Sequence, residues 1–122
     1  MEPDNYVSAI SYFTKAEVLS DLVPNSNSAS LRAKINDLRN KGGTNMHDAV
    51  EEAIDMLKDR KGSKNIIVIS DGRDNYINTY IGMIKSASEE GIVTHAVNLG
   101  TGSNIRNMQE IAEAGNGNYF KP

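Results

Sequence analysis

From Met46 to the C-terminus, the chain alternates between two hydrophobic patterns, and this alternation restricts the possible folds more than any other feature. In some segments apolar residues recur every three or four positions, which predicts amphipathic helices, and in others they form short unbroken runs, which predict strands. Strands that are separated by helices form a mostly parallel sheet. The predicted elements are a helix from Met46 to Leu57, a strand Lys64–Asp71, a helix Ile77–Glu90, a strand Ile92–Leu99, a helix Ser103–Ala114 and a short strand at Tyr119–Phe120.

The N-terminal part adds strands of a different kind. Asn5–Phe13 and Ala16–Val23 are separated only by Thr14 and Lys15, so we expect them to form a hairpin. A helix over Ala29–Lys41 follows, and Gly42 and Gly43 end it. The whole order predicts a single α/β domain over residues 1–122, with a doubly wound, mostly parallel sheet flanked by helices and one antiparallel edge.

The strand Lys64–Asp71 contains four consecutive β-branched apolar residues, Ile66 to Ile69. A continuous run of this kind is typical of a central parallel strand that is covered on both faces. We therefore expect Ile67 and Val68 in the core, one facing each helical layer. Asp71 would then lie at the carboxyl end of the most buried strand, where sheets of this type bind ligands.

Composition excludes several functional classes. The 122 residues include 13 Lys and Arg against 16 Asp and Glu, for a net charge of −3, and the isoelectric point is about 5.3. These values argue against a nucleic-acid-binding surface. No apolar run reaches the ~20 residues of a membrane-spanning helix, and the polar, acidic N-terminus does not read as a signal peptide. The absence of cysteine excludes disulfides, thiolate nucleophiles and Cys-ligated zinc.

Two motifs could carry chemistry. In Asp71-Gly72-Arg73-Asp74, a carboxylate follows the buried strand, which suits a hard cation, a phosphate-linked magnesium or a phosphoacceptor; the alternative is an ordinary Asp-Gly turn. In Gly42-Gly43-Thr44-Asn45, Thr44 places a hydroxyl at a helix N-terminus; the alternative is a helix C-cap followed by an N-cap.

The remaining candidates favour structural roles. The chain has no G-x-G-x-x-G, no G-x-x-x-x-G-K-[ST] and no G-x-S-x-G motif. His47 and His95 are far apart in the sequence and do not have the spacing that is typical of metal ligands. An acidic group on the helix from Met46, formed by Asp48, Glu51, Glu52 and Asp55, is typical of a solvated face. Nothing resembles a complete catalytic apparatus, so we expect a protein that is not an enzyme.

Taken in order, these segments resemble the von Willebrand factor type A (vWA) domain, the family that includes the integrin I domain. The resemblance covers nearly the whole chain and depends on several motifs in the family's order rather than on any one of them. They are Tyr12-Phe13 with Ala16-Glu17-Val18-Leu19, Gly42-Gly43-Thr44-Asn45 before a helix, Ile66 to Gly72 (IIVISDG), Gly91 to Gly100 (GIVTHAVNLG), and Ile111-Ala112 before Gly115 to Phe120 (GNGNYF).

The resemblance implies a Rossmann-like α/β domain that binds protein ligands, often in cell adhesion, through a metal-ion-dependent adhesion site (MIDAS). Three loops build that site in the family. Thr44 matches the threonine of the second loop and Asp71 the aspartate of the third, and both supply the hard oxygen donors that Mg²⁺ prefers. The implied partner is a protein that offers an acidic side chain to the metal. On the resemblance alone, we place the protein at the cell envelope or outside the cell.

The sequence departs from the family pattern in its first loop. No D-x-S-x-S occurs in the chain, which begins where the family's second strand would begin, so the first strand and first helix are missing. Either the chain is a fragment, or another chain fills the gap, or the remaining strands close up. If the edges of Asn5–Phe13 and Lys64–Asp71, the strands that would flank the missing one, are left open, a strand-swapped homo-oligomer is expected.

Two other functions are compatible with parts of this pattern. The first is a metal-independent interaction or scaffold domain, in which Thr44 and Asp71 no longer bind an ion. The second is a receiver-like domain with Asp71 as phosphoacceptor. The receiver fold would need an acidic pair after an early strand and a lysine after a later one, but Thr14-Lys15 and Gly100-Thr101-Gly102 stand there instead.

Overall fold

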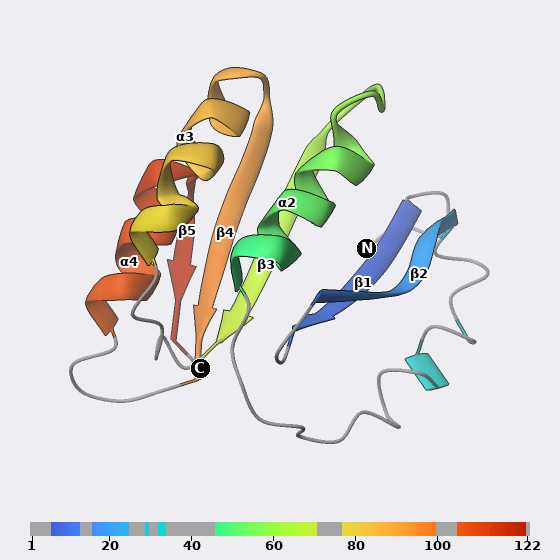
Figure 1. The fold of residues 1–122 in the computed structure, drawn as a ribbon, viewed down its shortest axis with the longest axis horizontal. Helices are drawn as coiled ribbons and strands as arrows, with labels where there is room; N and C mark the ends of the chain where they lie inside the picture. Colours follow the sequence, from blue (N-terminus) through green and yellow to red (C-terminus); the bar gives the residue numbers. More distant parts are fainter. Residues whose placement is uncertain are drawn as a thin grey trace. The chain divides into compact units, whose positions relative to one another are not determined.

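The computed structural model of the chain describes residues 6–12, 16–24, 29, 32–33, 46–70, 77–99 and 105–121 (Figure 1). The helix predicted over Ala29–Lys41 therefore lies almost entirely outside the described residues. The chain divides into two compact units, Met1–Glu52 and Ala53–Pro122. Each unit is described by itself.

The first unit contains the predicted hairpin. Strand β1 (Tyr6–Tyr12) pairs antiparallel with β2 (Ala16–Pro24), and the pairing begins beside the turn with Tyr12 opposite Ala16. The register shifts on both sides of Ala9, which marks an irregularity of the β-bulge type in this ribbon. The two strands form a two-stranded sheet of their own, so the hairpin prediction is confirmed.

Helix α2 (Met46–Leu57) has the amphipathic pattern that its spacing predicts. Met46, Ala49 and Val50 are buried, at positions i, i+3 and i+4. The predicted acidic face is exposed along the helix; its members are Asp48, Glu51, Glu52 and Asp55. The 3.6-residue period therefore identified both the helix and its buried side correctly.

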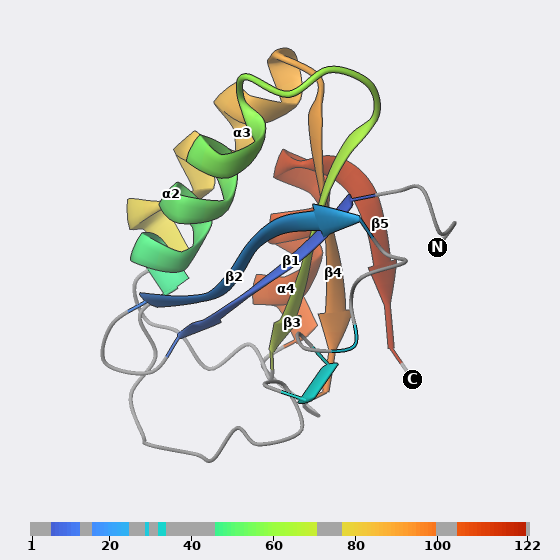
Figure 2. The same ribbon diagram turned by 90° about the vertical axis from the view of Figure 1, so that its right-hand side faces the viewer.

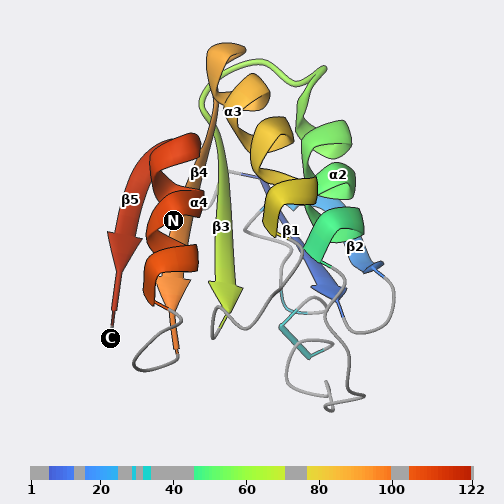
Figure 3. The ribbon, with the colours of Figure 1, turned by 60° about the vertical axis from the view of Figure 1, so that its left-hand side comes forward.

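The second unit contains a parallel sheet of three strands. They are β3 (Lys64–Ser70), β4 (Ile92–Asn98) and β5 (Asn116–Phe120), in the order β3-β4-β5 (Figure 3). The β3–β4 ladder is regular over its whole length, from Lys64 opposite Ile92 to Ser70 opposite Asn98. Both strands therefore end at the same level, and β4 is the middle strand of this sheet.

Two helices supply the crossovers that parallel strands require. A short 3₁₀ helix (Ile77–Thr79) leads into α3 (Ile81–Glu89), and α4 (Ile105–Ala114) follows β4. Helices α3 and α4 contact each other and β4, and both lie on the same side of the three strands (Figure 2). Because β3, β4 and β5 step across the sheet in one direction, right-handed crossovers place both helices on one face.

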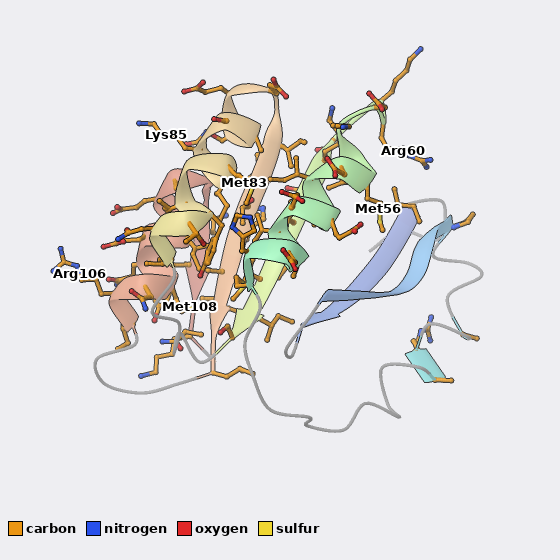
Figure 4. All side chains as sticks on the ribbon, viewed as in Figure 1. Met56, Arg60, Met83, Lys85, Arg106 and Met108 are labelled. Atoms are coloured by element: carbon orange, nitrogen blue, oxygen red, sulfur yellow. The ribbon has the colours of Figure 1, made fainter. Side chains whose placement is uncertain are left out.

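The core of the second unit is built between that face and the two helices. On β4, Ile92, Thr94, Ala96 and Asn98 are buried, whereas the alternate residues are only half-buried. The largest buried side chains of the helices and the turn before them are Tyr80, Ile84, Met108 and Ile111. Lys85 and Arg106 project outward from α3 and α4 (Figure 4). The α/β fold class, with a parallel sheet flanked by helices, is confirmed.

The expectation that Ile67 lies in the core is wrong. Val68 is 6% exposed, but Ile67 is 59% and Ile69 is 54% exposed. Among the three strands of the parallel sheet, the most deeply buried is β4, which has a strand on either side, and not β3. A run of β-branched residues reflects a high propensity for extended backbone on either face of a sheet. The run therefore identified a strand but did not establish that both of its faces are covered.

The ends of α3 and α4 use glycine in two different ways. After α3, Gly91 adopts φ of +87° and donates its N–H to the carbonyl of Ser88 at 3.1 Å, the left-handed helix stop that the sequence predicts. After α4, Asn116 takes the left-handed conformation, with φ of +56°. Gly115 is required for a different reason, since a Cβ there would lie 2.5 Å from Cβ of Thr94.

Candidate functional site

The two residues predicted as metal ligands, Thr44 and Asp71, lie outside the described residues, as do the other residues of their motifs. The structure does describe the strand end from which Asp71 departs, because Ser70 is the last residue of β3. It also describes the neighbouring end of β4. These two strand ends, with the side chains beside them, form the carboxyl edge of the sheet.

At the carboxyl edge, β3 and β4 remain hydrogen-bonded to their last residues. Ser70 lies opposite Asn98 in the register, and the N–H of Leu99 donates to the carbonyl of Ser70 at 2.9 Å. The residue before Asp71 is thus held by the ladder. Leu99 itself is 64% exposed. The chain therefore goes from the buried residue Asn98, which is paired with Ser70, to a solvent-exposed residue in one step.

Asn98 is the most unusual side chain of this edge. It is 1% exposed, and its Nδ2 donates to the hydroxyl of Tyr119 on β5 at 3.0 Å. A buried amide must be hydrogen-bonded to be tolerated, and this bond also connects two neighbouring strands. Asn98 was not predicted as a site residue, although an amide within the apolar strand Ile92–Leu99 is a visible signal in the sequence.

The carboxyl edge is more polar than the rest of the described core, in which Thr94 is the other buried polar residue. Ser70, Asn98 and Tyr119 bring two hydroxyls and one amide to the ends of three adjacent parallel strands. Such groups can position a neighbouring carboxylate, but they do not form a metal centre. In the part of the chain that the structure describes, no three His, Asp or Glu side chains are grouped as metal ligands.

Both histidines take part in local interactions that fit structural roles. Nε2 of His47 lies 3.9 Å from Oε2 of Glu51, one turn along α2. Nε2 of His95 is 3.0 Å from Oδ1 of Asn65, and Nδ1 of His95 accepts the backbone N–H of Asn118 at 3.0 Å. The two histidines lie on different elements and do not share a partner among these groups.

The buried hydroxyl of Thr94 is expected to lower the stability of the protein. Thr94 is 1% exposed, and its Oγ1 has no hydrogen-bond partner among the described residues. Thr94→Val keeps the shape and removes the unsatisfied hydroxyl, so we expect it to raise the free energy of unfolding by about 1 kcal/mol in urea denaturation. Thr94→Ser, which keeps the hydroxyl and loses the methyl group, is expected to lower it. A lower stability of Thr94→Val would mean that the hydroxyl is hydrogen-bonded.

The sequence profile of the von Willebrand factor type A domain matches residues 2–122. The chain belongs to the von Willebrand factor type A family. No curated protein sequence is significantly similar to it. The vWA assignment agrees with the parallel sheet and with the position of Asp71 after Ser70, at the end of a parallel strand.

Solved structures share the vWA fold at low sequence identity. An aerotolerance-related membrane protein from Bacteroides fragilis, carrying multiple mutations to serine, is 22% identical with a TM-score of 0.79, over 100% of this chain and 73% of that one. The SpRpn10 VWA domain is 18% identical with a TM-score of 0.77, over 99% and 66%. Proximal thread matrix protein 1 from the mussel byssus, with a zinc-occupied MIDAS motif, is 20% identical with a TM-score of 0.73, over 93% and 30%.

Proposed function

We propose that this vWA chain is a protein-binding module of the adhesion type, whose binding site lies at the carboxyl edge of the sheet. The observation that carries the proposal is the alignment of the β3 and β4 ends, directly before Asp71. Ligands of parallel α/β sheets bind at this edge. Regular pairing up to Ser70 and Asn98 holds the residue before Asp71 in the ladder.

A divalent cation is the natural cofactor for this edge. The hydroxyl of Thr44 and the carboxylate of Asp71 are hard oxygen donors, which fit Mg²⁺, and the related mussel protein has zinc at its MIDAS motif. When bound, the ion supplies positive charge for an acidic side chain of the protein partner. The chain's own part is to supply these two donors and to leave coordination positions open for the partner.

A specific observation also supports a second function, a metal-independent interaction or scaffold domain. Two donors cannot meet the near-octahedral demand of Mg²⁺, which keeps its waters when few protein ligands are present. The sequence contains no D-x-S-x-S to supply more. In this second function the same edge binds a partner through its polar and apolar groups alone.

The other functional proposals follow from composition and from the relatives. We propose that the protein is not an enzyme and binds neither nucleic acid nor the membrane interior; no described helix is long and apolar enough to span a bilayer. We propose a location at the cell envelope or outside the cell, supported by the likeness to a Bacteroides fragilis membrane protein.

We also propose that the chain forms a homo-oligomer. Ile67, Ile69 and Phe120 are 53–59% exposed, and exposed apolar side chains on a sheet favour association. Sedimentation equilibrium is expected to detect a dimer or a larger swapped assembly. Ile67→Lys, which places a charge among these side chains, is expected to shift the equilibrium toward monomer. A parent chain that stays monomeric at high concentration would contradict the proposal.

Paramagnetic broadening by Mn²⁺ tests the metal-dependent function, because it detects weakly bound ions. Manganese at the proposed site is expected to broaden the amide signals of Ser70 and Leu99 while sparing Lys64 and Ile92, about 20 Å away along the strands. Asp71→Asn is expected to abolish the selective broadening. If the two strand ends broaden equally or not at all, the metal-independent function is favoured.

A further inference from the structure

We propose that His95 is an acid-sensitive clasp that holds the C-terminal strand β5 on the sheet, and that protonation of its ring releases this strand. The clasp consists of three residues on three adjacent strands: Asn65 on β3, His95 on β4 and Asn118 on β5. It shares no residue with the carboxyl edge or with the metal ligands proposed above.

The clasp lies where the β4–β5 ladder is irregular. Thr94 is paired with Asn116 and Ala96 with Tyr119, so three steps along β5 correspond to two along β4. An extra residue in one strand leaves a backbone group without its regular ladder partner. The N–H of Asn118 lies in this stretch and donates to Nδ1 of His95 at 3.0 Å. A side chain thus takes the place of a strand carbonyl.

Close packing reinforces this arrangement. Gly117 approaches β4 so tightly that a Cβ there would overlap the carbonyl oxygen of Thr94 and would lie 3.0 Å from Nδ1 of His95. Asn116, just before it, has φ of +56°. The backbone from Gly115 to Asn118 is therefore shaped to bring one N–H to the imidazole.

The two hydrogen bonds of His95 select one neutral tautomer. Nδ1 must carry a lone pair in order to accept the N–H of Asn118, so the ring proton is on Nε2. That nitrogen faces Oδ1 of Asn65 at 3.0 Å, to which it donates. Only the neutral form of the ring can make both of these hydrogen bonds.

A second proton can bind only at Nδ1, where it would point at the N–H of Asn118. The bond between His95 and β5 is then lost, since both groups become donors. The side chains that share this face with His95 on the described strands are uncharged, so none of them can neutralise the imidazolium; they are Asn65, Ile67, Ile69, Val93, Val97, Asn118 and Phe120. Protonation therefore loosens β5 without a compensating ion pair from any of these described side chains.

Nuclear magnetic resonance of the ¹⁵N-labelled full chain tests the clasp. Long-range ¹H–¹⁵N correlations of the ring at neutral pH are expected to show the Nε2–H tautomer. The exchange protection of the Asn118 amide, corrected for the intrinsic pH dependence of exchange, is expected to fall about fivefold between about pH 8 and about pH 5, the factor for one ordinary hydrogen bond. The amide of Ala96, in the middle strand, is expected to stay protected.

Two variants separate the effect of His95 from that of His47, the other histidine of the chain. His47→Gln is expected to keep the acid response of Asn118, whereas His95→Gln is expected to abolish it. An Nδ1–H tautomer, a flat protection of Asn118, or a response that survives in His95→Gln would each overturn the proposal. If His95→Gln does not fold, the parent chain decides: the response of Asn118 must follow the titration of the His95 ring and not that of His47.

Discussion

Val68→Asp is expected to unfold the parallel sheet. Val68 is 6% exposed and lies opposite Ala96, which is fully buried in the middle strand. An unpaired carboxylate at such a position costs about 3–5 kcal/mol, a large part of the ~5–15 kcal/mol that stabilises a typical domain. Circular dichroism should therefore show a strongly lowered melting temperature or no cooperative transition.

Ile67→Asp is the matched control for this substitution. It makes the same chemical change one residue earlier on β3, but Ile67 is 59% exposed. The free energy of unfolding is expected to fall by about 1 kcal/mol or less, chiefly because aspartate has a lower strand propensity than isoleucine. If both variants unfold, both faces of β3 are buried in solution. If both melt near the parent temperature, β3 does not belong to the core.

Gly115→Ala is expected to be strongly destabilising, although it adds only one methyl group. Its Cβ would lie 2.5 Å from Cβ, 2.6 Å from the carbonyl oxygen and 2.9 Å from Cα of Thr94. Two of these three atoms belong to the backbone of Thr94, which cannot move aside as a side chain could. The backbone is also held in place, because the N–H of Thr94 donates to the carbonyl of Gly115 at 3.2 Å. The loss in unfolding free energy is expected to be about 2–3 kcal/mol.

Gly82→Ala provides the opposite control. Gly82 lies within α3, is exposed, and has nothing within 4 Å of the added Cβ. Alanine is the better helix former, so this variant is expected to be about 0.5–1 kcal/mol more stable than the parent. Urea denaturation of the two alanine variants should move the midpoint in opposite directions. If the Gly115→Ala variant is as stable as the parent, β4 and the turn after α4 are farther apart in solution than the distances given above.

The helices and strands of this chain were largely predictable, because each carries its own local signal. The burial of Met46, Ala49 and Val50 follows from their spacing along α2. The stop at Gly91 follows from the conformational freedom of glycine, and φ of +87° confirms it. The division of the predicted helix Ile77–Glu90 at Tyr80 had no comparable signal, because the apolar period continues through it.

The burial of individual strand faces was less predictable, because it depends on where the crossovers run. The four residues Ile66 to Ile69 look alike in the sequence, yet only Val68 among them is buried, at 6% exposed. Their difference arises from the common direction of the β3-β4-β5 order, which puts α3 and α4 on one side. No local pattern encodes that choice.

The carboxyl edge was predictable in position but not in detail. A carboxylate after a strand identified the edge at Asp71, and the register confirms that the β3 and β4 ends meet there. The bond from Asn98 to Tyr119 joins residues 21 positions apart, and that of Asn118 to His95 spans 23. Such pairs depend on strand register, which a single sequence does not specify.

Titration calorimetry with Mg²⁺ tests the metal-dependent function most directly. The chain alone, with two donors from Thr44 and Asp71, is expected to bind the ion weakly or not at all, whereas a chain extended at its N-terminus by a strand and a D-x-S-x-S loop is expected to bind it. Asp71→Ala in the extended chain is expected to abolish binding. Tight binding by the chain alone would mean that other ligands complete the site, Asp74 or a second copy being the first to examine. An extended chain that folds and binds no Mg²⁺ would contradict the adhesion-site proposal and favour the metal-independent scaffold.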